Sequence, residues 1–194
     1  MSEQLTGRLI DAGVETILRH TEELTGLDSA IGDGDHGLNM KRGFEALAQS
    51  RAELTALPLD EALKKAGMTL VMKIGGASGP LYGSLLMAMG KSGGSAQQML
   101  SAGVQAVKSR GKSDVGEKTM LDVLVPVLAA LNAQADTGRI RKVADDALET
   151  TRDMLATKGR ASFLGKRSVG HIDPGARSSC LLVQAVCDVM EDSK

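Results

Sequence analysis

Apolar residues recur along this chain at intervals of three and four, the spacing that places side chains on one face of an α-helix. In the first such stretch, Leu5, Leu9, Ile17 and Leu24 follow this spacing until Gly26 supplies a stop signal. Glycine and proline end most of the later stretches in the same way. The pattern predicts eight helices, over residues 2–26, 38–51, 59–74, 80–89, 95–111, 119–135, 139–158 and 176–192.

The choice of apolar residues supports a helical fold. Leu, Ala and Met are abundant, whereas the chain has 2 Phe, 1 Tyr and no Trp, and few of the β-branched residues that favour strands. The chain shows no internal repeat and no linker of low complexity, and 194 residues suit one ordinary domain. The predicted fold is therefore all-α, a single domain over residues 1–194 in which the helices form an antiparallel bundle.

Charge and cysteine content exclude several classes of function. With 23 Lys and Arg against 24 Asp and Glu, the net charge is −1, so the chain lacks the basic field that binds nucleic acid or an acidic membrane surface. No apolar run approaches the ~18 residues that span a bilayer, and the N-terminus is not typical of a cleaved signal. Cys180 and Cys187 lie two turns apart on one predicted helix, too far for a disulfide within it. These features predict a cytoplasmic protein with reduced cysteines.

The connections between the predicted helices alternate in composition. Three are short and carry no unusual chemistry, around residues 57–58, 92–94 and 136–138. Four are rich in Gly, Asp, Ser and His, around residues 28–37, 75–79, 111–119 and 159–175. Because short loops make successive helices antiparallel, all four rich connections are expected at the same end of the bundle. We predict one functional site there; the plainer interpretation is that these glycines only stop helices and fill turns.

Three aspartates in the first rich connection indicate a metal site. Asp28, Asp33 and Asp35 lie within eight residues, in a turn with three glycines. Carboxylates about 4 Å apart repel by roughly 4 kcal/mol at an effective dielectric constant of 20, so the cluster favours a bound cation. Oxygen ligands select Mg²⁺, Mn²⁺ or Ca²⁺, and a calcium EF-hand is excluded because its twelfth position would be Phe44. We predict Mg²⁺, with a solvated acidic turn as the alternative.

Two known phosphate-binding motifs match parts of this sequence, but both can be excluded. Gly32, Gly34 and Gly37 spell G-x-G-x-x-G, but no strand precedes them and two carboxylates stand where pyrophosphate would lie. A P-loop is excluded because the first glycine that it needs before Gly-Lys-Ser would be Leu85 or Ala106.

The turn over residues 75–79 is a better candidate for phosphate. Its free backbone N–H groups, the Ser78 hydroxyl and the positive end of the helix that starts at Pro80 can hold an anion, although the turn alone could be only a tight connection. Arg160, His36 and His171 are further candidate polar contacts. Together with the aspartates, this turn predicts a Mg²⁺-nucleotide site at one end of the bundle, suited to phosphoryl transfer.

Four strings then carry a resemblance to a known family. They run in order from about Leu24 to Ser179 and are TGLDSAIGDGDHGLNMKRGF, GMTLVMKIGGASGPLYG, SRGKSDVGEKTMLDVLVPV and KGRASFLGKRSVGHIDPGARSS. The chain resembles the nucleotide-binding subunits of bacterial dihydroxyacetone kinases of the phosphotransferase-dependent type, enzymes of glycerol metabolism. The resemblance implies a barrel of eight antiparallel helices with ADP or ATP bound at one rim.

The resemblance also implies roles for individual residues. Asp28, Asp33 and Asp35 would ligate two Mg²⁺ ions that bridge the phosphates. The nucleotide would be surrounded by His36, Gly37, Leu38, Asn39, Ala77, Ser78, Gly111, Met120, Arg160, Asp173, Pro174 and Gly175. Among these, Ser78 would hold phosphate, while Gly111 and Met120 would lie near the base. Glu117 stands where the family more often has Asp, a departure that affects no predicted ligand.

The partners also follow from the resemblance. Dihydroxyacetone would be held covalently by a histidine on a separate substrate-binding subunit, so no catalytic base or nucleophile is expected in this chain. A phosphohistidine on a phosphotransferase-system subunit would rephosphorylate ADP in place. The chain has no room for a fused substrate domain, which favours this form over the ATP-exchanging one. Two alternatives stay open: a subunit of a kinase for another small ketose such as erythrulose, and a nucleotide-loaded module that signals to a transcriptional regulator.

Overall fold

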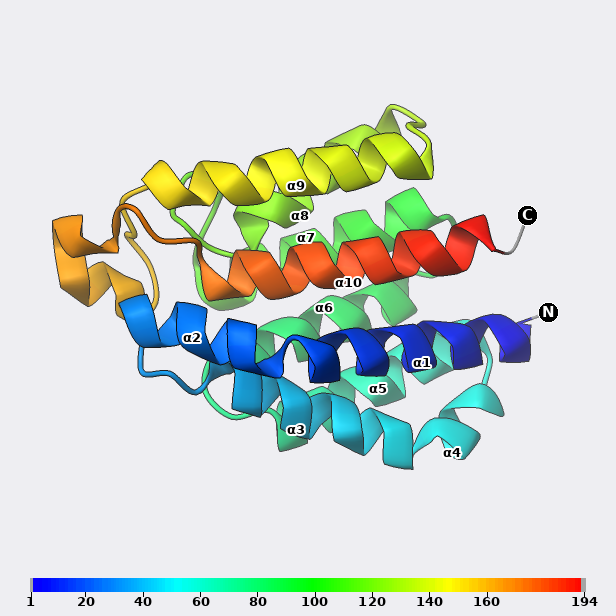
Figure 1. Ribbon diagram of the computed structural model, residues 1–194. Helices are drawn as coiled ribbons and strands as arrows, with labels where there is room; N and C mark the ends of the chain where they lie inside the picture. The colour runs from blue at the N-terminus through cyan, green and yellow to red at the C-terminus, as the bar shows by residue number, and fades with distance from the viewer. Residues whose placement is uncertain (1, 193–194) are drawn as a thin grey trace.

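The computed structural model describes residues 2–192, and over this range the chain is helical and without strands (Figure 1). The α-helices are α1 (Ser2–Arg19), α2 (Thr21–Ile31), α3 (His36–Gln49), α4 (Arg51–Thr55), α5 (Leu59–Lys73), α6 (Ser78–Ser92), α7 (Ala96–Gly111), α8 (Leu121–Asn132), α9 (Thr137–Asp153) and α10 (Pro174–Glu191). One 3₁₀ helix, η1 (Arg160–Ser168), precedes α10. The all-α prediction is confirmed. None of the described helices is long and apolar enough to cross a membrane.

The long helices close into a ring. Helix α1 packs against α3, α3 against α5, and each of α5 to α9 against the next, after which α10 contacts both α9 and α1. Helix α2 continues α1 along the same edge of the molecule, and the short α4 lies beside α1 and α5 (Figure 1). The antiparallel eight-helix barrel implied by the resemblance corresponds to this ring.

The first predicted helix is wrong in its boundary. A break at His20 separates α1 from α2, and Gly26 lies inside α2 instead of ending it. A single helical glycine costs only about 1 kcal/mol relative to alanine, and Leu24 and Ile31 are buried on either side of it, so tertiary packing overrides the stop signal. Helix α2 therefore reaches Ile31 and carries Asp28 on its last turn.

Helices α5 and α6 approach closely because glycines line their contact. A Cβ on Gly83 would lie 2.7 Å from the Gly67 carbonyl oxygen and 2.3 Å from Val71 Cγ2. A Cβ on Gly90 would lie 2.4 Å from the Asp60 carbonyl oxygen. The absence of side chains at these positions allows the close approach of the two helices.

The end of α9 and the connection that follows it also differ from the predicted pattern. Helix α9 ends at Asp153, not near residue 158, because Met154 is extended (ψ 142°) and the chain leaves the helix there. The 3₁₀ helix η1 forms inside the connection that the pattern left without structure, and non-helical Gly165 interrupts it. In Figure 1, η1 lies at the end of the molecule opposite the two labelled termini.

Candidate functional site

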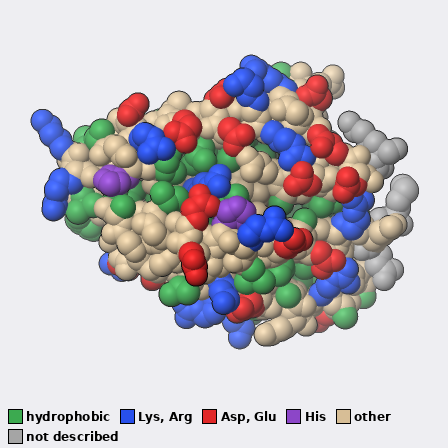
Figure 2. Space-filling view, in the orientation of Figure 1, with side chains coloured by type: hydrophobic (Ala, Val, Ile, Leu, Met, Phe, Trp, Pro, Cys, Tyr) green, Lys and Arg blue, Asp and Glu red, His purple; other side chains and the backbone are tan. Residues whose placement is uncertain are grey.

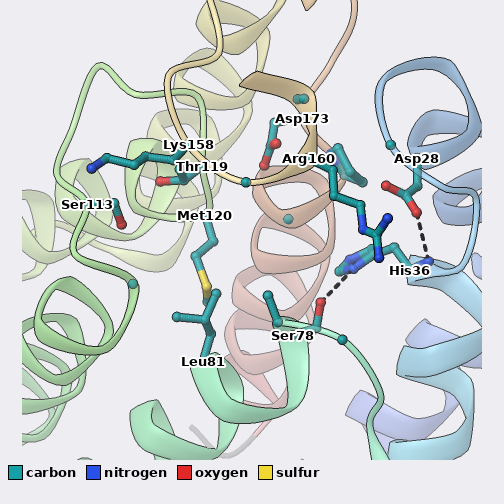
Figure 3. Close-up of a pocket in the computed structure, with 18 of the residues that line it drawn as sticks. Asp28, His36, Ser78, Leu81, Ser113, Thr119, Met120, Lys158, Arg160 and Asp173 are labelled. Atoms are coloured by element: carbon teal, nitrogen blue, oxygen red, sulfur yellow. Dashed lines mark hydrogen bonds between the residues drawn. The ribbon is translucent and has the colours of Figure 1, made fainter. Parts of the chain in front are cut away.

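A cavity of about 500 Å³ opens at the η1 end of the barrel, and residues from all four glycine-rich connections line it. Figure 3 shows Asp28 and His36 on one side, Ser113 and Lys158 on the other, and Ser78 at the start of α6. The predicted convergence of these connections at one end is therefore confirmed by their common cavity. Shape and depth suit a ligand of nucleotide size.

The three aspartates form one acidic cluster on this cavity. Each of Asp28, Asp33 and Asp35 offers a carboxylate oxygen that lies within 4.8 Å of the other two. Asp28 is buried, and its Oδ2 accepts the backbone N–H groups of Asp35 (2.8 Å) and His36 (3.1 Å). These bonds hold the carboxylate in place before any ligand arrives.

A glycine is required beside this carboxylate. A Cβ on Gly32 would lie 2.0 Å from Asp28 Oδ1, so any side chain there would push the carboxylate away. Gly34, at φ +74°, adopts a left-handed conformation that lets the turn place Asp33 and Asp35 on either side of it. The donor set consists of oxygens only and fits a hard divalent cation such as Mg²⁺.

Arg160 reaches across the mouth of the cavity from η1. One of its guanidinium nitrogens lies 3.0 Å from Asp33 Oδ2, and 69% of its side chain is exposed. Because the pair is exposed, it contributes little to stability. The arrangement places an exposed positive charge where a cation or a phosphate would interact with Asp33.

The start of α6 forms the floor of the cavity. Gly76 has φ +64°, which turns the chain so that Ala77 and Ser78 lead into the first turn of α6. No side chain caps this helix end, so its first N–H groups are available to an anion. The Ser78 hydroxyl lies 2.9 Å from His36 Nδ1 (Figure 3).

Behind Ser78 lies a buried group of polar side chains. His36 Nε2 is 2.9 Å from Ser178 Oγ, and Tyr82 Oη is 2.7 Å from Ser178 Oγ and 2.9 Å from Ser179 Oγ. Burial lowers the pKa of His36, while the charges of Asp28 and Asp35 act in the opposite direction. Burial likewise raises the pKa of Tyr82 to about 12, so its hydroxyl keeps its proton.

The opposite wall of the cavity is more apolar. Leu81, Val107 and Met120 line it together with the backbone of Gly111. Ser113, Thr119, Arg110 and Lys158 surround this part as polar groups. Such a slot, apolar with polar groups at its edge, suits a flat heterocycle.

Lys118 and Asp173 form the wall between these two parts. Lys118 is 1% exposed, and its Nζ donates to the carbonyl oxygens of Ser168 (2.6 Å), His171 (2.7 Å) and Met154 (3.2 Å). Burial lowers the pKa of Lys118, partly offset by the charge of Asp173. Asp173 caps α10 by accepting the Ala176 N–H at 2.7 Å, and burial raises its pKa to about 7.

Most of the predicted site residues meet at this cavity. Those that line it are Asp28, Asp33, Asp35, His36, Ala77, Ser78, Gly111, Met120, Arg160, Asp173, Pro174 and Gly175. Gly37, Leu38 and Asn39 lie just behind the acidic turn and do not line it. Leu38 is 54% exposed, while Asn39 is buried against Gly75. His171 is exposed and contributes its carbonyl to Lys118.

Buried polar groups behind Ser78, and the buried Lys118, were not identified from the sequence patterns. Tyr82, Ser178, Ser179 and Lys118 are not among the predicted site residues. The available signal was the pair of serines on the face of α10 whose other buried residues are apolar, because buried hydroxyls need partners. Their partner Tyr82 lies about 96 residues away in sequence, so spacing alone could not identify it.

Comparison with known proteins extends this description. The DAK2 domain family matches residues 30–188. The chain is 46% identical over 179 residues to the ADP-binding subunit DhaL of PEP-dependent dihydroxyacetone kinase 1 from Listeria innocua, which covers 89% of each chain. It is 41% identical to the corresponding DhaL subunit from Escherichia coli (strain K12), over 84% of this chain and 86% of that one.

Longer kinases match over part of their length. The D-erythrulose kinase of Mycolicibacterium smegmatis is 34% identical over 95% of this chain, which corresponds to 35% of that protein. The solved structure of the dihydroxyacetone kinase from C. freundii in complex with AMP-PNP and Mg²⁺ superposes with a TM-score of 0.79 at 25% identity, over 95% of this chain and 34% of that one. The chain thus spans about one third of the longer kinases and nearly all of the separate subunits.

Proposed function

The chain belongs to the DAK2 domain family, and from that premise we propose that it is the ADP-binding subunit of a dihydroxyacetone kinase. Its relatives are named kinases, so the protein is a phosphotransferase component. In the proposed reaction, a phosphoryl group passes from a Mg²⁺-bound nucleotide in this chain to dihydroxyacetone on a separate subunit.

The single observation that carries the proposal is the acidic cluster that faces the start of α6 across one cavity. Asp28, Asp33 and Asp35 would hold two Mg²⁺ ions, which neutralise phosphate charge when bound. The uncapped N–H groups at Ala77 and Ser78 would hold phosphate oxygens from the other side. Cation and anion sites that share one cavity are what a Mg²⁺-nucleotide requires.

The rest of the proposed nucleotide site follows from this placement. The base would occupy the apolar slot at Gly111 and Met120, and the first turn of α10, at residues 173–175, would lie beside the phosphates. Arg160 would leave Asp33 and pair with a phosphate oxygen. Gly37, Leu38 and Asn39 would support the acidic turn from behind.

Beyond binding the metal ions and the nucleotide, phosphoryl transfer requires few further groups from this chain. Phosphoryl transfer depends mainly on positioning and on electrostatic stabilisation of the phosphate oxygens. We therefore propose that the group which activates dihydroxyacetone belongs to the substrate-binding partner subunit. The separate-subunit relatives are named PEP-dependent or PTS-dependent, which supports ADP being rephosphorylated in place by a phosphotransferase-system phosphohistidine.

A second candidate is a subunit that exchanges ATP freely and serves another small ketose. The 34% identity to D-erythrulose kinase is the observation that supports this second candidate. The two candidates differ in whether the nucleotide leaves the site after each transfer.

The test is to purify the full chain in Mg²⁺ without added nucleotide, denature it, and identify released nucleotide by chromatography. A parallel sample is soaked in labelled ATP. Retained ADP that does not exchange supports the resident-nucleotide form, and free exchange supports the second candidate. Absence of nucleotide from both samples would overturn the proposed site.

A further inference from the structure

A row of buried hydrogen-bonding side chains ends at the Ser78 hydroxyl. It runs from Ser179 to Tyr82 (2.9 Å), then to Ser178 (2.7 Å), to His36 Nε2 (2.9 Å), and from His36 Nδ1 to Ser78 (2.9 Å). Tyr82, Ser178 and Ser179 are 2%, 0% and 1% exposed, so water does not replace these partners. The row connects α10 to the cavity floor through one imidazole ring.

Two arrangements of protons satisfy this row. Each hydroxyl has one proton, and a neutral imidazole has one N–H and one lone pair. In the first arrangement, Ser178 donates to the Gly175 carbonyl (3.1 Å), His36 Nε2 donates to Ser178, and Ser78 must donate to Nδ1. In the second, Ser178 donates to Nε2, and Nδ1 donates to Ser78.

The two arrangements differ in what Ser78 offers to the cavity. In the first, its proton points to His36 and only lone pairs face a ligand. In the second, its proton is free to point into the cavity. A phosphate oxygen can only accept, so the first arrangement sets oxygen lone pairs against an anion and the second supplies a donor. The Gly175 carbonyl does not need the Ser178 proton, because in α10 it accepts the N–H four residues later.

We propose that His36 carries a proton on Nδ1, held there by Ser178 at Nε2, so that the Ser78 hydroxyl donates to a nucleotide phosphate. The inference deepens the proposed function and rests on it, since it requires phosphate at Ser78. His36 and Ser178 are positioning residues in this scheme.

Nitrogen NMR reads the position of the proton directly. The chain has 3 His, so ¹⁵N-histidine labelling gives three imidazoles, and His36→Gln identifies the signals of His36. In the full chain loaded with Mg²⁺ and ADP, Nδ1 of His36 is expected to be protonated. In Ser178→Ala, the hydroxyl that donates to Nε2 is lost, and the proton is expected to move from Nδ1 to Nε2. An Nε2 proton in the loaded wild-type protein would overturn the inference.

Affinity for Mg²⁺-ADP, measured by calorimetry, separates positioning from a merely structural role. Ser78→Ala and Ser178→Ala are each expected to weaken binding about tenfold, and the double variant no further, because both remove the same hydrogen bond. Ser179→Ala is the matched control: it removes a neighbouring buried hydroxyl that contacts Tyr82 and not His36, and should leave affinity unchanged. Losses that add in the double variant would contradict the scheme.

If Ser178→Ala does not fold, a second pair of variants, His36→Asn and His36→Gln, tests where the His36 proton lies. The amide of His36→Asn can place a donor near the position of Nδ1, whereas that of His36→Gln reaches only the position of Nε2. His36→Asn should therefore bind Mg²⁺-ADP more tightly than His36→Gln; the reverse order would overturn the scheme. If wild-type protein binds no ADP, the proposed function fails; if it binds ADP with Nε2 protonated, only this inference fails.

Discussion

At the scale of single residues, the acidic turn combines a fixed carboxylate with two freer ones. Asp28 is buried and accepts two backbone N–H groups, whereas Asp33 and Asp35 are exposed. The buried carboxylate belongs to the folded framework of the turn, and the exposed ones are free to respond to a cation. Substitutions at these positions should therefore separate stability from ligand binding.

Asp33→Ala should abolish phosphoryl transfer and leave the helices folded. Removing one carboxylate relieves repulsion in the ligand-free turn while it removes a proposed metal ligand. Transfer is measured with the partner subunit present, and folding by circular dichroism and thermal unfolding. Asp146→Ala, which removes an exposed carboxylate on α9 that pairs with Lys142, is the control. Full activity of Asp33→Ala at ordinary Mg²⁺ concentration would contradict the metal assignment.

Asp173 should make the protein less stable as the pH rises through the acid range. Burial raises its pKa from 3.8 to about 7, so the folded protein keeps a proton that the unfolded chain has released. The free energy of unfolding therefore falls between about pH 4 and pH 7 by up to about 4 kcal/mol from this group.

Asp173→Asn should remove this contribution, because the amide oxygen still caps α10 and carries no charge. Urea unfolding of both proteins from about pH 4.5 to 8 measures the difference. The variant should gain stability relative to wild type as the pH rises. Curves that stay parallel would show that Asp173 does not hold its proton.

At the scale of elements, glycine has opposite consequences in two helices. In α6, a Cβ on Gly83 would meet Val71 Cγ2 at 2.3 Å and the backbone of Gly67 at 2.7 Å. In α2, nothing lies within 4 Å of a Cβ on Gly26. Gly83→Ala should lower the free energy of unfolding by about 2 kcal/mol or more, whereas Gly26→Ala should raise it by about 0.5–1 kcal/mol. Denaturant unfolding of the two variants tests both signs, and a stable Gly83→Ala would contradict the close packing of α5 and α6.

The connection from α9 to α10 is held by a lysine ammonium. Lys118 donates to the carbonyl oxygens of Met154 before η1, Ser168 at its last residue and His171 after it. Lys118→Met leaves these buried acceptors without their donor and should lower the free energy of unfolding by about 3–5 kcal/mol. Hydrogen exchange at the Gly170 amide, which bonds to the Arg152 carbonyl at 2.7 Å, should accelerate.

Lys142→Met is the control for that variant. Lys142 is exposed and pairs with Asp146 on the same helix, so its loss should change stability by less than about 0.5 kcal/mol. If the two substitutions lower the free energy of unfolding equally, the hydrogen bonds of the Lys118 ammonium do not stabilise the connection from α9 to α10.

At the scale of the whole molecule, the segment around η1 differs in charge from the rest of the chain. The chain carries a net charge of −1, but residues 154–172 contain Lys158, Arg160, Lys166 and Arg167 and no acidic residue. Phe163 is 87% exposed in the middle of this segment. Figure 2 shows Lys or Arg side chains protruding at this end beside apolar ones. A basic surface with an exposed aromatic residue, next to the proposed phosphate site, suits the acidic face of a protein partner.

Docking of the partner subunit should therefore depend on this segment. Phe163→Ser with Lys166→Glu and Arg167→Glu is expected to raise the KM for the substrate-binding subunit about tenfold or more at low salt, and less at high salt. Affinity for Mg²⁺-ADP should not change. Arg139→Glu, near the start of α9 and away from η1, is the control for charge alone. An unchanged KM would place the docking surface elsewhere.

Features encoded by residues that are close together in the sequence were predictable, whereas contacts between distant residues were not. The helical spacing, the alternation of plain and rich connections and the cluster of Asp28, Asp33 and Asp35 are local features, and each predicted what the fold contains. The pattern failed at Gly26 and at η1, where packing outweighs local preference: buried Leu24 and Ile31 carry α2 past a glycine.

The sequence alone therefore determined the helical class, the end of the barrel where the glycine-rich connections meet and the clustering of three aspartates there, because repeating patterns and neighbouring residues encode them. Only the tertiary structure decided what orients the site. His36 meets Ser178 across 142 residues, and Lys118 meets His171 across 53. Such pairs satisfy buried polar groups that no local pattern can match, since partners are chosen by the folded surfaces that exclude water around them.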